Sequence, residues 1–141
     1  MGDQGVVSVT RVADAVVEEV VLFTQHQGRA LAGQVQAALK RGIGRWRDGP
    51  YLARIVFCEM LLHAEHPFEG TEGYGIYARL TDEMSVDRPV ISIATDLQEV
   101  FVMDFLPSTI RTVWRGSLDE FVVLDLATTP GFEAFRAKGA Q

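Results

Sequence analysis

The most informative stretch of the sequence runs from Val90 to Leu126 and reads VISIATDLQEVFVMDFLPSTIRTVWRGSLDEFVVLDL. Apolar and polar residues alternate here with a period of two, which is typical of β-strands. The connections are only a few residues long, so consecutive strands should pair antiparallel as a meander. We expect four strands here and a fifth upstream, at residues 90–95, 99–105, 110–115, 120–126 and 74–80.

Apolar residues at helical spacing precede these strands. Residues 10–23 carry them at positions i, i+3, i+4 and i+7 and predict a first helix, although their valines leave a strand at residues 19–24 open. The apolar stripe from Leu31 to Trp46 predicts a second helix, and residues 51–66 predict a third, which is nearly all apolar. A short helix is expected at residues 130–138, where a proline and an early acidic residue suit a helix start.

Together these elements predict an α+β fold class, with N-terminal helices followed by a mainly antiparallel five-stranded meander sheet and a short C-terminal helix. With 141 residues, 48% of them hydrophobic, the chain can bury one core, and we expect a single domain over residues 1–141. The longest apolar run has four residues, so no membrane-spanning helix is expected. The lone Cys58, the N-terminal sequence and the excess of Arg over Lys favour a cytoplasmic, bacterial protein.

The two faces of the predicted sheet differ in character. One face collects Phe101, Met103 and Trp114 with other apolar residues, and we expect it to pack against the helices. The opposite face mixes charged side chains with apolar ones, so something should cover it: the C-terminal helix, a curled sheet that encloses a ligand, or a second protein chain. We predict a protein interface, with a partner or in a homo-oligomer, on the apolar residues of this face: Val100, Val102, Val113, Phe121 and Val123.

Charge is unevenly distributed along the chain. The formal net charge is −6, with seven basic and six acidic residues before Leu61 but six basic and thirteen acidic residues from Leu61 onward. We therefore expect the second half to face a basic surface of a partner protein. Charges that flank strand turns can project without a burial cost, so the same interface should include Asp96, Glu99, Asp119 and Glu120.

A basic patch lies within the first half. Lys40, Arg41, Arg45 and Arg47 stand close together in the sequence, with Arg54 shortly after them. The patch is typical of a solvated helix end, and the alternative is a docking site for a phosphate group or an acidic partner. The negative net charge argues against a nucleic-acid binder.

One segment could hold a metal ion. Glu59, His63 and His66 are spaced so that their side chains can meet on a helix, and carboxylate and imidazole groups bind zinc and iron. The simpler interpretation is that both histidines satisfy carbonyl groups at the helix end before Pro67. We expect no metal and no cofactor. Cys58 sits in an apolar run and is expected to be a buried, inert thiol.

The sequence contains no nucleophile elbow, no HExxH zinc motif and no P-loop. We therefore predict a non-catalytic protein-interaction domain, of the immunity or inhibitor kind, that covers a basic surface of its partner. The alternative is a domain that binds or transforms a small molecule in a pocket near the loop after the third helix. That pocket would involve Tyr74, Tyr77, Arg79, His63 and Glu59.

Overall fold

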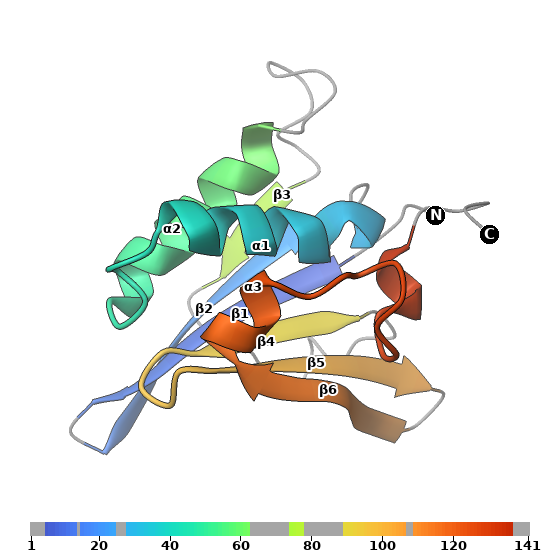
Figure 1. The fold of residues 1–141 in the computed structure, drawn as a ribbon. Coiled ribbons are helices and arrows are strands. Elements are labelled where there is room, and N and C mark those ends of the chain that lie inside the picture. Colours follow the sequence, from blue (N-terminus) through green and yellow to red (C-terminus); the bar gives the residue numbers. More distant parts are fainter. Residues whose placement is uncertain are drawn as a thin grey trace.

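The computed structural model describes residues 5–13, 15–24, 28–62, 74–77, 89–106 and 109–136. It is an α+β structure in which a layer of helices covers one face of a mixed sheet (Figure 1). The sheet has six strands in the order β3-β2-β1-β4-β5-β6. Neighbouring strands pair antiparallel except for β1 and β4, which are parallel. The prediction of α+β is confirmed, but the sheet is not a simple meander.

The chain begins with a β-hairpin where a helix was predicted. β1 (Gly5–Ala13) and β2 (Val16–Thr24) pair along their whole lengths, and Ala15 takes a φ of 66° in the turn between them. The helix expected at residues 10–23 is therefore wrong. The first part of β1 is buried on both faces, since Val6, Val7, Ser8 and Val9 are all buried. Within residues 10–23, the valines on both sides of the turn happen to fall at helical spacing, although Val12, Val16 and Val17 are exposed.

Of the strands expected in the second half, three are confirmed, one is confirmed over residues 74–77 while its residues 78–80 lie outside the described part, and one is wrong. The strands present are β3 (Tyr74–Tyr77), β4 (Val90–Ala94), β5 (Glu99–Leu106) and β6 (Thr109–Ser117). The strand expected at residues 120–126 is wrong, because α3 (Leu118–Val122) begins there with a capping box. In that box the Ser117 side chain accepts a hydrogen bond from the Glu120 amide, and the Glu120 carboxylate accepts one from the Ser117 amide.

The helix layer starts with a 3-10 turn, η1 (Gly28–Ala30), followed by α1 (Leu31–Arg41) and α2 (Gly49–Leu62). α1 lies within the helix predicted from Leu31 to Trp46 but ends at Arg41. α2 begins two residues before the predicted start at residue 51, and residues 63–66 of that prediction lie outside the described part. Of the helix expected at residues 130–138, only the 3-10 turn η4 (Glu133–Phe135) is present, and residues 137 and 138 lie outside the described part.

The C-terminal segment is held by an aromatic cluster. Phe132 is fully buried, and its ring centroid lies 5.7 Å from that of Trp114 and 6.0 Å from that of Phe121. Phe135 joins them at 6.2 Å from Phe132. Hydrogen bonds from the backbone amides of Glu133 itself and of Gly131 to the Glu133 carboxylate lower the pKa of Glu133 below its usual value.

The faces of β5 are opposite to the prediction. Val100 and Val102 pair with Ile93 and Ile91 of β4, and all four side chains are fully buried in the core beneath the helices. Their neighbours Phe101 and Met103 consequently point to the other face. A register irregularity at Val102/Met103 places Trp114 opposite Val102, so Trp114 still points to the helix side.

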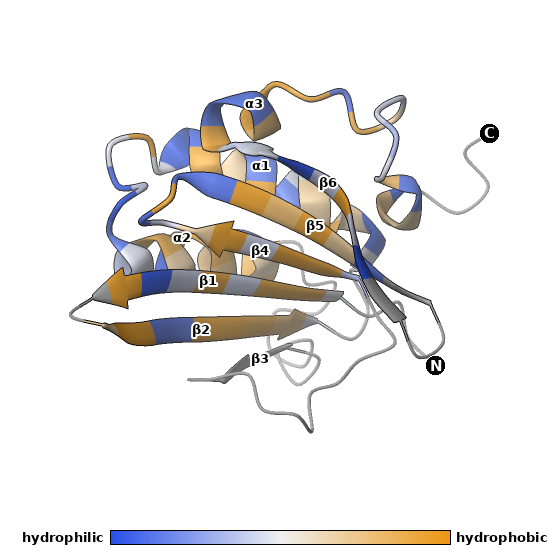
Figure 2. Cartoon of the chain, turned by 90° about the horizontal axis from the view of Figure 1, so that it is seen from below, coloured by the Kyte–Doolittle hydropathy of each residue, from blue (hydrophilic) through white to orange (hydrophobic). Residues whose placement is uncertain are grey.

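The face turned away from the helices has a small core of its own. Val6, Val21 and Val90 lie side by side on neighbouring strands and are buried, with Phe23 and Met103 packed against them. Figure 2 shows this face in front of the helices, with hydrophobic residues on neighbouring strands. The mixed character of the sequence in these strands thus reflects burial on both faces of the sheet.

Candidate interaction surface

Four connecting segments meet at one end of the molecule, and we call this the connection end. They are the β1–β2 turn, the α1–α2 connection (residues 42–48), the β4–β5 turn (residues 95–98) and the start of α3. The parallel pairing of β1 and β4 brings their last residues to the same end, and Ser117 at the end of β6 lies opposite Glu99 at the start of β5. Figure 1 shows the α1–α2 connection and the β4–β5 turn at the side of the molecule where β1 ends and β2 begins, with α3 next to the β4–β5 turn.

Gln98 joins three of these segments. Its side-chain amide donates to the carbonyl oxygens of Trp46, at 3.1 Å, and Thr95, at 2.6 Å. Its own carbonyl accepts a hydrogen bond of 3.2 Å from the Leu118 amide at the start of α3. Gln98 also has a φ of 55°, a backbone conformation that is uncommon outside glycine and that the surrounding contacts must hold in place.

Further hydrogen bonds fix the rest of the connection end. The amide and hydroxyl groups of Thr95 both donate to the carbonyl of Thr10, each at 2.9 Å. The indole of Trp46 donates to the carbonyl of Leu39 at 2.9 Å, which ties the α1–α2 connection back to α1. The surface is therefore built on cross-linked turns and is preorganised for contact.

Exposed apolar side chains gather on this surface. Seven large hydrophobic side chains of the described residues are more than half exposed, and five of them lie at the connection end: Val12, Val16, Val17, Ile43 and Leu97. β4 ends opposite Thr10, so the hairpin of β1 and β2 continues for about 10 Å beyond it, which explains the exposure of its valines. Apolar groups on rigid turns are typical of a contact surface.

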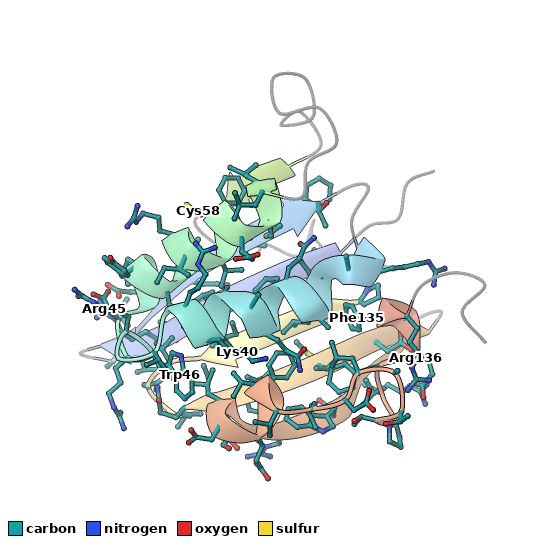
Figure 3. The ribbon with its side chains drawn as sticks, turned by 45° about the horizontal axis from the view of Figure 1, so that its top comes forward. Lys40, Arg45, Trp46, Cys58, Phe135 and Arg136 are labelled. Carbon is teal, nitrogen blue, oxygen red and sulfur yellow. The ribbon has the colours of Figure 1, made fainter. Side chains whose placement is uncertain are left out.

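The predicted basic patch borders this surface. Arg45 and Arg47 are exposed, and Figure 3 places Arg45 and Trp46 in the α1–α2 connection, with Lys40 in α1. The guanidinium groups of Arg45 and Arg54 lie 4.5 Å and 5.0 Å from the ring centroid of Tyr51. Tyr51 was not linked to the predicted patch, although a cation four or fewer residues from an aromatic side chain, as Arg54 is from Tyr51, is a usable signal in a helix.

The members of the basic patch differ in whether an acidic residue pairs with them. Arg41 is engaged with Glu59, with 2.6 Å between Nη1 and Oε1. Among the residues that the structure describes, Arg45, Arg47 and Lys40 have no acidic partner within 4.0 Å. The patch therefore presents cations that nothing in the described part of the chain neutralises.

The four acidic residues predicted for the interface also lie at this end of the sheet. Glu99 pairs with Arg115, with 3.1 Å between Oε2 and Nε, and Glu120 belongs to the capping box. Asp96 and Asp119 are exposed and, within the described residues, have no ion-pair partner. Two of the four are thus available to a partner protein.

Most of the apolar residues predicted for the interface are buried. Val100, Val102 and Phe121 are fully buried, so their assignment to an exposed face is wrong. Val113 is partly buried and packs against the core, whereas Val123 is 79% exposed just after α3. Ile43 was missed because its helical spacing assigned it to the apolar stripe of a helix that in fact ends at Arg41. Leu97 was missed because it stands in a turn, outside any periodic pattern.

The metal and thiol predictions concern α2. Cys58 is exposed on α2, so the expectation of a buried thiol is wrong. Glu59 is buried and paired with Arg41, while His63 and His66 lie outside the described residues. Among the described residues, no group of three potential ligands stands close enough to hold a metal ion.

The small-molecule alternative depends on a different part of the chain. The side chains of Tyr74 and Tyr77 and the whole of Arg79 lie outside the described residues, as does the loop after α2. One hollow of the described part, between Arg11, Glu18 and Gly49, has room for about 20 Å³, enough for a single water molecule.

Comparisons with known proteins add no assignment. A scan against protein-family models, a search of curated proteins and a search of solved structures each gave no match. No helix in the described part of the chain is both long enough and apolar enough to span a membrane.

Proposed function

We propose that this chain is a non-catalytic protein-interaction domain that contacts its partner through the connection end. The observation that carries the proposal is the gathering of exposed apolar side chains on hydrogen-bonded turns, above all Ile43 and Leu97, which are 70% and 62% exposed. Exposed aliphatic groups on a rigid surface favour association because their burial releases water without ordering the backbone.

The charged residues beside this contact indicate the kind of partner. Asp96 and Asp119 are exposed near Leu97, where they would meet basic groups of the partner protein. Acidic groups at the rim of an interface chiefly accelerate encounter and select the partner. We therefore propose a partner with a basic surface, as for an immunity or inhibitor protein.

The test compares two double variants. The tagged chain is used to capture and identify a partner from its native cell, and the affinity for the purified partner is then measured. Ile43→Ser with Leu97→Ser should weaken binding about 100-fold, since each lost apolar side chain costs about 1.5 kcal/mol. The matched control is Leu62→Ser with Val123→Ser, which removes two equally exposed apolar side chains from elsewhere.

The control should bind like the unaltered chain. An affinity that Ile43→Ser with Leu97→Ser leaves unchanged would refute the connection end as the contact surface. An equal loss of affinity in both double variants would show that general surface hydrophobicity is responsible. Urea unfolding of each variant verifies that the fold is intact.

A further inference from the structure

The two charged groups of the connection end stand on opposite sides of one turn. Gln98 reaches the basic α1–α2 connection through its side chain, at Trp46, and the acidic start of α3 through its backbone, at Leu118. Leu97, the exposed neighbour of Gln98, follows Asp96 in this turn, and Gln98 joins the turn to the connection that carries Arg45 and Arg47 and to the helix start that carries Asp119.

We propose that the connection end binds a second copy of this chain in a two-fold symmetric dimer, with Leu97 near the symmetry axis. In a two-fold symmetric dimer the same surface of each chain contacts that of the other chain, so every contact between two different residues occurs twice. It would place Arg45 and Arg47 of each chain against Asp96 and Asp119 of the other. This inference rests on the proposed function and names the partner of the same surface.

Charge complementarity is the reason to choose a second copy. Arg45, Arg47, Asp96 and Asp119 are all exposed, and within the described part of the chain none of them has an ion-pair partner. With Asp48, which is also exposed without an ion-pair partner among the described residues, two cations and three anions surround an apolar centre, so each chain offers both signs to a second copy. The basic partner surface that the acidic residues need is then the α1–α2 connection of the second chain.

A nucleic acid fits this surface less well. The Trp46 indole is half-buried and donates to the Leu39 carbonyl, and two guanidinium groups lie against the Tyr51 ring. Neither ring is therefore free for base stacking, which is a main source of single-strand affinity. Asp96 and Asp119 would also repel a phosphate backbone.

The test uses sedimentation velocity and two complementary charge reversals. One variant carries Arg45→Glu with Arg47→Glu, and the other carries Asp96→Lys with Asp119→Lys. In each of them like charges face each other twice across the axis, so the dimer dissociation constant should rise at least tenfold. An equal mixture of the two variants should restore the dimer, because every facing pair is again opposite in sign.

Each other outcome points to a different conclusion. A dimer that both variants leave unchanged would overturn the proposal and assign the dimer to another surface. An unaltered chain that stays monomeric up to about 100 µM would also overturn it, while the proposed function stands if Ile43 and Leu97 are still needed for a captured partner. Binding of a short nucleic-acid duplex in place of self-association would contradict both the proposal and the choice of partner.

Discussion

At the residue scale, the buried side-chain amide of Gln34 in α1 destabilises the folded state. Its side chain is only 4% exposed, and neither the nitrogen nor the oxygen of its amide group has a hydrogen-bond partner among the residues that the structure describes. Gln36, two residues later, shows the contrast, since its amide nitrogen donates to the carbonyls of Phe121 and Leu124 at 3.0 Å each. A buried polar group without a partner destabilises the folded state by about 1 to 3 kcal/mol.

We expect Gln34→Met to stabilise the protein by about 1 kcal/mol, because it removes the unpaired amide while keeping a side chain of similar length. Gln36→Met is the matched control and should destabilise by about 1 kcal/mol or more, since two carbonyls lose their donor. Urea unfolding monitored by circular dichroism measures both. A Gln34→Met variant less stable than the unaltered chain would show that the amide has a partner in solution.

Single residues also mark how far the sequence could predict the site. The alternation in residues 99–105 revealed a strand but not its orientation, because Val100, Phe101, Val102 and Met103 are all apolar. Only pairing with β4 decides which of them face the helices. Asp96 and Asp119 could be predicted, since turn residues project from the sheet whichever way its faces point.

At the element scale, the hairpin and α3 were the two errors. Residues 10–23 form strands because their valines favour β-structure and the two strands can pair along their length, whereas helical spacing alone carries no information about a pairing partner. For α3, the sequence Ser117-Leu-Asp-Glu120 is a capping box, a local signal that outweighs the apolar run behind it. The helices α1 and α2 could be predicted because each buries one face, and the strands β4, β5 and β6 because short turns separate their apolar runs.

Replacing Gly131 tests how closely the C-terminal segment packs against β6, and replacing Gly33 in α1 is the control. Gly131 has a φ of 100°, and a Cβ there would lie 2.5 Å from the carbonyl oxygen of Val113. Gly131→Ala should destabilise by about 2 kcal/mol or more, because the strained backbone displaces Phe132 from the aromatic cluster. Trp114 fluorescence should change with it.

Gly33→Ala is the control for this test. Gly33 lies in α1, where an added Cβ meets nothing within 4 Å, so this change should stabilise by about 1 kcal/mol through helix propensity. Thermal unfolding separates the two variants. A Gly131→Ala protein as stable as Gly33→Ala would contradict the close contact between the C-terminal segment and β6.

At the scale of the whole molecule, the described residues carry a different balance of charge from the rest of the chain. The described part of the chain holds 11 of the 19 acidic residues and 10 of the 13 basic residues. The described surface is therefore nearly balanced in charge, and the acidic surplus belongs mostly to residues 63–73 and 78–88. A balanced surface with separated signs suits contact with its own copy better than contact with a strongly charged partner.

Cysteine cross-linking at Leu97 tests most directly whether two chains meet at the connection end. With the exposed Cys58 replaced by Ser, a cysteine at position 97 would lie close to its symmetry mate, within the Cα separation of about 5.5 Å that a disulfide needs. The matched control carries Leu62→Cys, at the other end of α2 and equally exposed at 67%. Mild oxidation should convert the Leu97→Cys chain into a covalent dimer at least ten times faster than the control. Equal rates in the two variants, or no covalent dimer from Leu97→Cys, would contradict contact through this surface.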